Sequence, residues 1–141
     1  MKTAIILVSA LLWLWFLGCT ITWRIGRHLL VEGMGVRSIE CGMLVCFTAG
    51  LLLYLAGLPA GRWVLAALLA VWLIAQFFSH EYYTLFGASP QKLAGYQQCF
   101  ANTVKLFAPS STRLIPDLYH IILHLLIAAD LILVLLDLLL A

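Results

Sequence analysis

Residues 117–141 read DLYHIILHLLIAADLILVLLDLLLA, and this stretch decides the class of the protein. It is long and apolar enough to cross a bilayer as a helix, since about 20 residues span roughly 30 Å of hydrocarbon. Its ionisable side chains are Asp117, His120, His124, Asp130 and Asp137. A charged side chain at the bilayer centre costs about 2.5–3.5 kcal/mol on insertion scales. We therefore expect these groups to face a protein interior, a partner helix or a site.

The composition of the whole chain agrees with a membrane protein. Of its 141 residues, 65% are hydrophobic and 10% are charged, whereas soluble domains carry about 25% charged residues. We expect an all-α integral membrane protein, a single domain of residues 1–141 built as a bundle of four transmembrane helices. The expected spans are residues 4–23, 39–58, 63–80 and 114–140.

Charge is distributed unequally between the expected loops. The net charge of +2 excludes nucleic acid as a partner. The positive-inside rule places the loops richer in Lys and Arg in the cytoplasm. We therefore predict a multipass protein of the cell membrane with both termini outside, in contact with lipid and with either a second copy or another membrane protein. The first and third loops hold Arg24, Arg27, Arg37, Lys92, Lys105 and Arg113, and the other face holds Lys2 and Arg62.

The third loop is predicted to contain an amphipathic helix over residues 90–108. Ser89 is a candidate N-cap, and Pro90 suits the first helical position. Apolar side chains then recur at helical spacing from Leu93 to Phe107. Such a helix lies either in the membrane interface or flat on the end of the bundle.

Two further features suggest contacts of the spans. Ser111 or Thr112 is the expected cap of the final helix, and a helix N-terminus beside Arg113 also suits a phosphate or a lipid headgroup. In the second span, small residues form a packing ridge that lets another helix approach closely. The ridge consists of Gly42, Cys46 and Gly50.

At 100° per residue, Asp117, His120 and His124 share one stripe of the final helix. His80 and Glu81 end the third span at the same membrane face. These five side chains are a candidate site for a transition metal, because imidazoles at i and i+4 with a nearby carboxylate are suitable ligands. Haem b would need His80 to face one of the other two histidines across the bundle. The alternative is polar packing, with neutral imidazoles hydrogen-bonded to Gln76 or Thr48.

Asp130 and Asp137 lie on a different and deeper face of the same helix. Asp137 is level with Arg62 and Lys2, so an ion pair would explain it. Asp130 has no cation at its depth in this chain. It is either a coupling acid for protons or ions or a contact with another subunit.

Three functions are compatible with these patterns. The first, which we favour, is an accessory, assembly or self-associating subunit that docks through the small-residue ridge and Asp130. The second is a membrane-embedded metal or haem protein that uses His80, Asp117, His120 and His124, and a lipid-directed enzyme is one form that it could take. The third is a small proton- or ion-coupled transporter with Asp130 as the coupling acid. No pattern in the sequence decides whether the protein is an enzyme.

Overall fold

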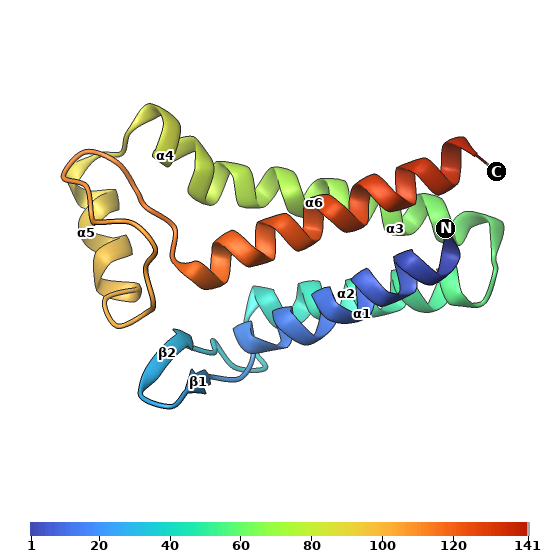
Figure 1. Cartoon of the computed structure of the whole chain (residues 1–141), viewed down its shortest axis with the longest axis horizontal. Helices are drawn as coiled ribbons and strands as arrows, with labels where there is room; N and C mark the ends of the chain where they lie inside the picture. The colour runs from blue at the N-terminus through green and yellow to red at the C-terminus, as the bar shows by residue number, and fades with distance from the viewer. Residues whose placement is uncertain (141) are drawn as a thin grey trace.

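The computed structural model describes residues 1–140 and is mostly helical (Figure 1). Its long helices are α1 (Lys2–Phe16), α2 (Ile39–Leu55), α3 (Pro59–Gln76) and α6 (Leu118–Leu139). The shorter elements are η1 (Leu17–Cys19), β1 (Trp23–Ile25), β2 (His28–Val31), η2 (Phe77–Glu81), α4 (Tyr82–Phe86) and α5 (Pro90–Cys99). Both termini lie at one end of the molecule, and the strands and α5 lie at the other (Figure 1). We call the latter the hairpin end.

Three continuous helices are long and apolar enough to cross a membrane, by length and composition. They are Lys2–Cys19, Pro59–Phe86 and Leu118–Leu139. Helix α2 is also apolar but has only 17 residues. The predicted mainly helical class is therefore confirmed, and the apolar helices are compatible with a membrane protein. The count of four spans stays a prediction.

The long helices are apolar on their inner and outer faces. Within α1, Ile5 and Leu12 are fully buried in the core, whereas Leu7 and Leu14 are more than half exposed. The same division holds in α6, where Leu123 is buried and Leu125 is exposed. Outward apolar side chains along several helices suit contact with lipid, because a soluble monomer rarely exposes so large an apolar surface.

Glycines bring α2 and α3 close together. A Cβ atom added to Gly61 would lie 2.6 Å from the backbone oxygen of Leu53, so α3 begins directly against the end of α2. At Gly50 the added atom would lie 2.7 Å from the Leu68 side chain. Within residues 1–140, the other two residues of the expected packing ridge, Gly42 and Cys46, do not contact another helix in this way. Gly42 has no neighbour within 4 Å of an added Cβ, and Cys46 is exposed, so neither packs inside the protein.

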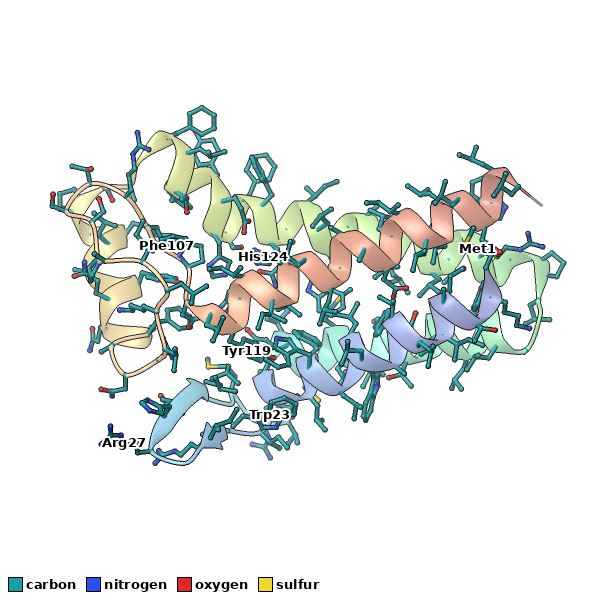
Figure 2. The ribbon with its side chains drawn as sticks, viewed as in Figure 1. Met1, Trp23, Arg27, Phe107, Tyr119 and His124 are labelled. Atoms are coloured by element: carbon teal, nitrogen blue, oxygen red, sulfur yellow. The ribbon has the colours of Figure 1, made fainter. Side chains whose placement is uncertain are left out.

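The first and last of the long helices are joined by a reciprocal pair. Trp15 donates from Nε1 to the backbone oxygen of Tyr119 at 3.1 Å, and the Tyr119 hydroxyl donates to the backbone oxygen of Trp15 at 2.6 Å. Their rings stack with centroids 5.2 Å apart. Tyr119 lies between the two helices (Figure 2). This pair fixes the end of α1 against the first turn of α6.

The hairpin end departs from the expected all-α architecture. The first loop folds into a small antiparallel hairpin of β1 and β2. The amphipathic helix ends at Cys99 and does not reach residue 108. The chain beyond it is held by tertiary hydrogen bonds, because Val104 donates its backbone N–H to Leu29 and accepts one from Leu118. These bonds replace the helical pattern that the apolar spacing predicted.

Helix α6 begins later than predicted, at Leu118. Asp117 is its N-cap and accepts the backbone N–H of His120 at 3.0 Å. The expected caps Ser111 and Thr112 therefore do not cap it. The helix N-terminus that suggested a phosphate site beside Arg113 is absent from that position within residues 1–140. The backbone N–H of Arg113 is instead bonded to Ser110 Oγ.

Candidate functional site

A π-helical segment places His80 at the site. Helix α3 is regular to Gln76, and η2 then forms wider turns over Phe77–Glu81. Such segments insert an extra residue into a turn and are frequent at functional sites. Here His80 is buried, with 8% of its surface exposed.

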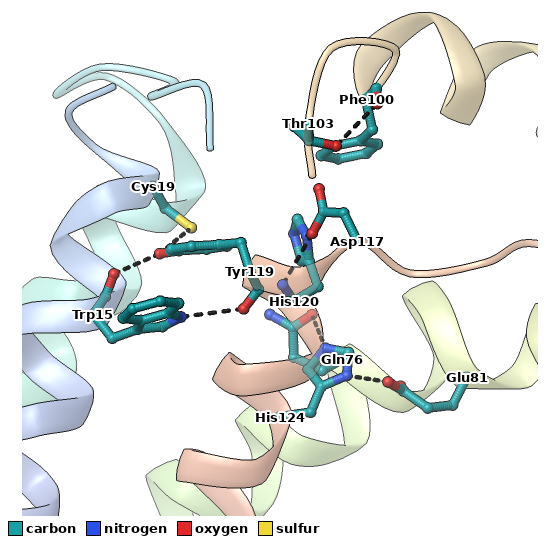
Figure 3. Close-up of polar contacts among 10 residues, drawn as sticks. All are labelled: Trp15, Cys19, Gln76, Glu81, Phe100, Thr103, Asp117, Tyr119, His120 and His124. Atoms are coloured by element: carbon teal, nitrogen blue, oxygen red, sulfur yellow. Dashed lines mark hydrogen bonds and ion pairs between the residues drawn. The ribbon is translucent and has the colours of Figure 1, made fainter. Parts of the chain in front are cut away.

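Asp117 and His120 form a buried pair at the start of α6 (Figure 3). Asp117 Oδ1 lies 2.7 Å from His120 Nδ1, in addition to capping the backbone. Burial raises the pKa of the Asp117 carboxyl, but the hydrogen bonds and charge of His120 outweigh burial and leave this pKa below its usual value. A carboxylate on Nδ1 holds the proton there, so the neutral imidazole carries its lone pair on Nε2.

His124 uses both of its ring nitrogens within the protein (Figure 3). Its Nε2 lies 3.2 Å from Gln76 Oε1, and its Nδ1 forms an ion pair with Glu81. The predicted hydrogen bond to Gln76 is thus confirmed. Thr48 instead accepts from Trp13 Nε1 at 2.8 Å. His124 therefore orients neighbouring side chains and has no nitrogen left for a ligand.

The three histidines converge, as the sequence suggested. The ring centroid of His80 lies 4.5 Å from that of His120 and 5.4 Å from that of His124. Some polar atoms of this cluster stay without a partner among residues 1–140. They are His80 Nδ1, Tyr96 Oη and Asp117 Oδ2, all enclosed by protein. Buried polar atoms are nearly always bonded, so three exceptions in one cluster require an explanation.

A pocket of about 560 Å³ adjoins this cluster. Its walls are mainly apolar and come from α2, α3 and the hairpin end, including Met43, Val71 and Trp72. His80 and His120 line it. Within residues 1–140, His120 Nε2 has no hydrogen bond and is not enclosed by protein. It is therefore accessible from the pocket that His120 lines.

The predicted metal and haem sites gain no support from this geometry. Within residues 1–140, no group of three His, Cys, Asp or Glu side chains is arranged to hold a metal ion. The His80 and His120 rings are inclined by only 33°, with centroids 4.5 Å apart. Rings that nearly stack leave no space for a porphyrin between their nitrogens. The histidines of the candidate site instead contact one another and their hydrogen-bond partners.

The deeper acids are bound inside the protein. Asp130 is fully buried, and Ser9 Oγ lies 2.9 and 2.7 Å from its two carboxylate oxygens. Asp130 thus faces α1, and its predicted contact with another subunit stays a prediction. Asp137 accepts from the Tyr54 hydroxyl at 3.3 Å. Among residues 1–140 it forms no ion pair, so the expected partners are replaced by a tyrosine.

Sequence reasoning missed several contributors to the site. Ser9 is a polar residue inside an apolar span, and this was a usable signal. Tyr96 lies within the apolar pattern predicted from Leu93 to Phe107, but its ring lies 5.8 Å from that of His80. The π-helical segment has no signature in the residues that form it.

Comparison with known proteins adds no relative. No family model matches the chain, and no curated protein or solved structure matches it. Its function therefore has to be inferred from the chemistry of the site.

Proposed function

We propose that this protein spans the membrane four times and binds a membrane-dissolved amphiphile in the pocket at the hairpin end. The observation that carries the proposal is a pocket of about 560 Å³ with apolar walls and two histidines in its lining. Ligand pockets have volumes of about 300–1,000 Å³ and combine apolar walls with a few convergent polar groups. This pocket has both properties.

The two ends of such a ligand have distinct places. Met43, Val71 and Trp72 offer apolar surface to a hydrocarbon tail. His120 offers the lone pair of Nε2 to the polar head, because Asp117 occupies Nδ1. His80 is buried beside it with an unpartnered nitrogen. A bound head group that reaches His120 would contact a ring nitrogen that otherwise has no hydrogen bond.

The directions of the helices support the four-span arrangement. Helices α1, α2, α3 and α6 alternate in direction, so both termini lie at the end opposite the hairpin (Figure 1). Figure 2 shows Met1 at that end and Arg27 and Phe107 at the hairpin end. With 17 residues, α2 rises about 25 Å, and small mismatches to the bilayer are absorbed at modest cost. The charge bias of the loops favours a cytoplasmic position for the hairpin end.

The functions first suggested by the sequence are supported less well. For docking as an accessory or self-associating subunit, Gly42 and Cys46 still face outward and are available. Asp130 is not available, because it is bound to Ser9. A transporter would use Asp130 as its coupling acid, and that carboxyl does not line the pocket. Self-association stays a prediction.

A photoreactive probe tests the proposal. The full chain, in discs of zwitterionic lipid, is labelled with a long-chain alcohol that carries a diazirine in its tail. We expect labelled peptides from α2 and the second half of α3, where Met43 and Trp72 line the pocket. Unlabelled alcohol in excess should reduce this labelling, because the pocket holds a limited number of molecules.

A matched pair of variants separates the pocket from general contact with lipid. Ala75 and Ala67 are both exposed on α3, but only Ala75 lines the pocket. Ala75→Phe should fill the pocket and abolish competed labelling, and Ala67→Phe should leave it unchanged. Labelling that is equal in both variants, or that excess alcohol does not reduce, would contradict the proposal.

A further inference from the structure

Resting on the proposed function, we infer that the pocket selects an amphiphile whose head is a positively charged amine, in preference to a carboxylate or a phosphate. The inference combines the charges, the hydrogen-bond acceptors and the aromatic rings that line the pocket.

Both charged residues of the lining are acidic. Glu32 follows β2, and Glu40 lies in the first turn of α2. Neither takes part in an ion pair within residues 1–140, and no Lys or Arg of that part of the chain lines the pocket. An anionic head would be repelled by two carboxylates and would find no cation. A cationic head would be attracted by both, and close to a membrane this attraction is stronger than in water.

The histidine cluster offers an acceptor to the same head. His120 Nε2 is open to the pocket and accepts hydrogen bonds when the ring is neutral with its proton on Nδ1. An ammonium group has only donors, so it is complementary to this nitrogen and to the two carboxylates. A phosphate or a carboxylate has only acceptors when ionised, so it is not complementary to this nitrogen or to the two carboxylates.

Aromatic rings complete the lining. The Phe16 and Trp72 rings lie with centroids 4.3 Å apart, and Phe100 lies 5.1 Å from His120. All three line the pocket. The faces of such rings attract cations within about 6 Å of the ring centre. Anions gain nothing comparable from these faces.

Two sources provide an ammonium head with a hydrocarbon tail: a single-chain alkylamine and a two-chain aminophospholipid. The test compares three diazirine probes with the same tail, namely an alkylamine, an alcohol and a carboxylate. Labelling is measured on the full chain in zwitterionic lipid discs and corrected for the partition of each probe into discs without protein. We expect the amine to label the pocket about tenfold more than the carboxylate at equal membrane concentration.

Charge-neutralising variants identify the residues responsible. The double substitution Glu32→Gln and Glu40→Gln should reduce the amine preference to near unity. Asp137→Asn removes one carboxylate at the opposite end of the molecule and should leave the preference unchanged. Competition by unlabelled alkylamine or by phosphatidylethanolamine supports the inference, and the better competitor identifies the source.

The two proposals fail in different ways. Equal labelling by all three probes would overturn the amine preference and leave amphiphile binding intact. If the amine preference falls as much in Asp137→Asn as in the double variant, the preference depends on net charge alone. That result would also overturn the inference. Absence of competed pocket labelling by every probe would overturn the proposed function itself.

Discussion

Asp117 and Asp130 are both fully buried carboxyls, but they are satisfied to different degrees. Asp130 lies within α6, and both of its oxygens are within hydrogen-bond distance of Ser9. Asp117 caps the same helix and bonds His120 through Oδ1, while its Oδ2 has no partner among residues 1–140. Its partner His120 lines the pocket, whereas Asp130 and Ser9 do not.

This difference separates a structural acid from a functional one. A bonded carboxyl that is enclosed on all sides contributes to the fold and has nothing to offer a ligand. A carboxyl that orients an accessible imidazole gives that imidazole a defined acceptor. In a membrane, where both kinds of acid are costly, unsatisfied atoms beside a pocket are the better guide to function.

The largest effect on stability is expected from Asp117→Ala. This change removes the cap of α6, worth about 0.5–2 kcal/mol, and the charge-assisted bond to His120, worth about 1.5–3 kcal/mol. We expect the free energy of unfolding in mixed micelles to fall by about 3 kcal/mol. A loss below 1 kcal/mol would show that Asp117 is not the anchor of this end of α6.

Ser9→Ala should follow, with a loss of about 2 kcal/mol, because it leaves Asp130 buried without a partner. The double variant Ser9→Ala with Asp130→Leu should regain most of this loss, since no polar group then stays unpaired. Unfolding titrations of the wild type, Ser9→Ala and the double variant measure these free energies. Amphiphile labelling should be unchanged in the double variant, and its disappearance would mean that Asp130 also serves the pocket.

Asp117→Asn isolates the charge of Asp117 from its capping role. Asparagine caps helices as well as aspartate does, so the unfolding free energy should change by less than about 1 kcal/mol. The amide oxygen is a weaker acceptor than a carboxylate and holds the proton on His120 Nδ1 less firmly, so competed labelling by the amine probe should weaken by up to about tenfold. Unchanged labelling would remove Asp117 from the site.

The smallest expected effect is on the unfolding free energy at low pH. The pKa of Asp117 is lowered in the folded chain from an ordinary value of 3.8. Its stabilising contribution is therefore complete above that value and is lost as the pH falls through the lower folded-state pKa. Between about pH 5 and pH 1, wild-type protein should lose more unfolding free energy than Asp117→Asn. Parallel curves for the two proteins would contradict this assignment.

Patterns within short stretches of sequence predicted the features that depend on neighbouring residues alone. The helical period placed Asp117, His120 and His124 on one stripe, and length and hydropathy identified the long apolar helices. The end of α5 at Cys99 depends on hydrogen bonds to β2, which no local pattern contains. The cap of α6 was assigned too early because Ser111 and Thr112 are also good caps, although Asp117 follows Pro116 directly. The turn at His80 belongs to the π-helical segment, and no spacing of residues in the sequence predicts such a segment.

The reciprocal pair of Trp15 and Tyr119 has a consequence for the order of assembly. Its two members are 104 residues apart, so α1 is synthesised long before its partner in α6. Until then, the indole N–H of Trp15 and the hydroxyl of Ser9 have no partner on α6. A nascent chain that stops before α6 lacks Asp117 and His120 as well. The arrival of α6 therefore joins α1 to α6 and brings His120 to the pocket, whose other lining residues come from earlier in the chain.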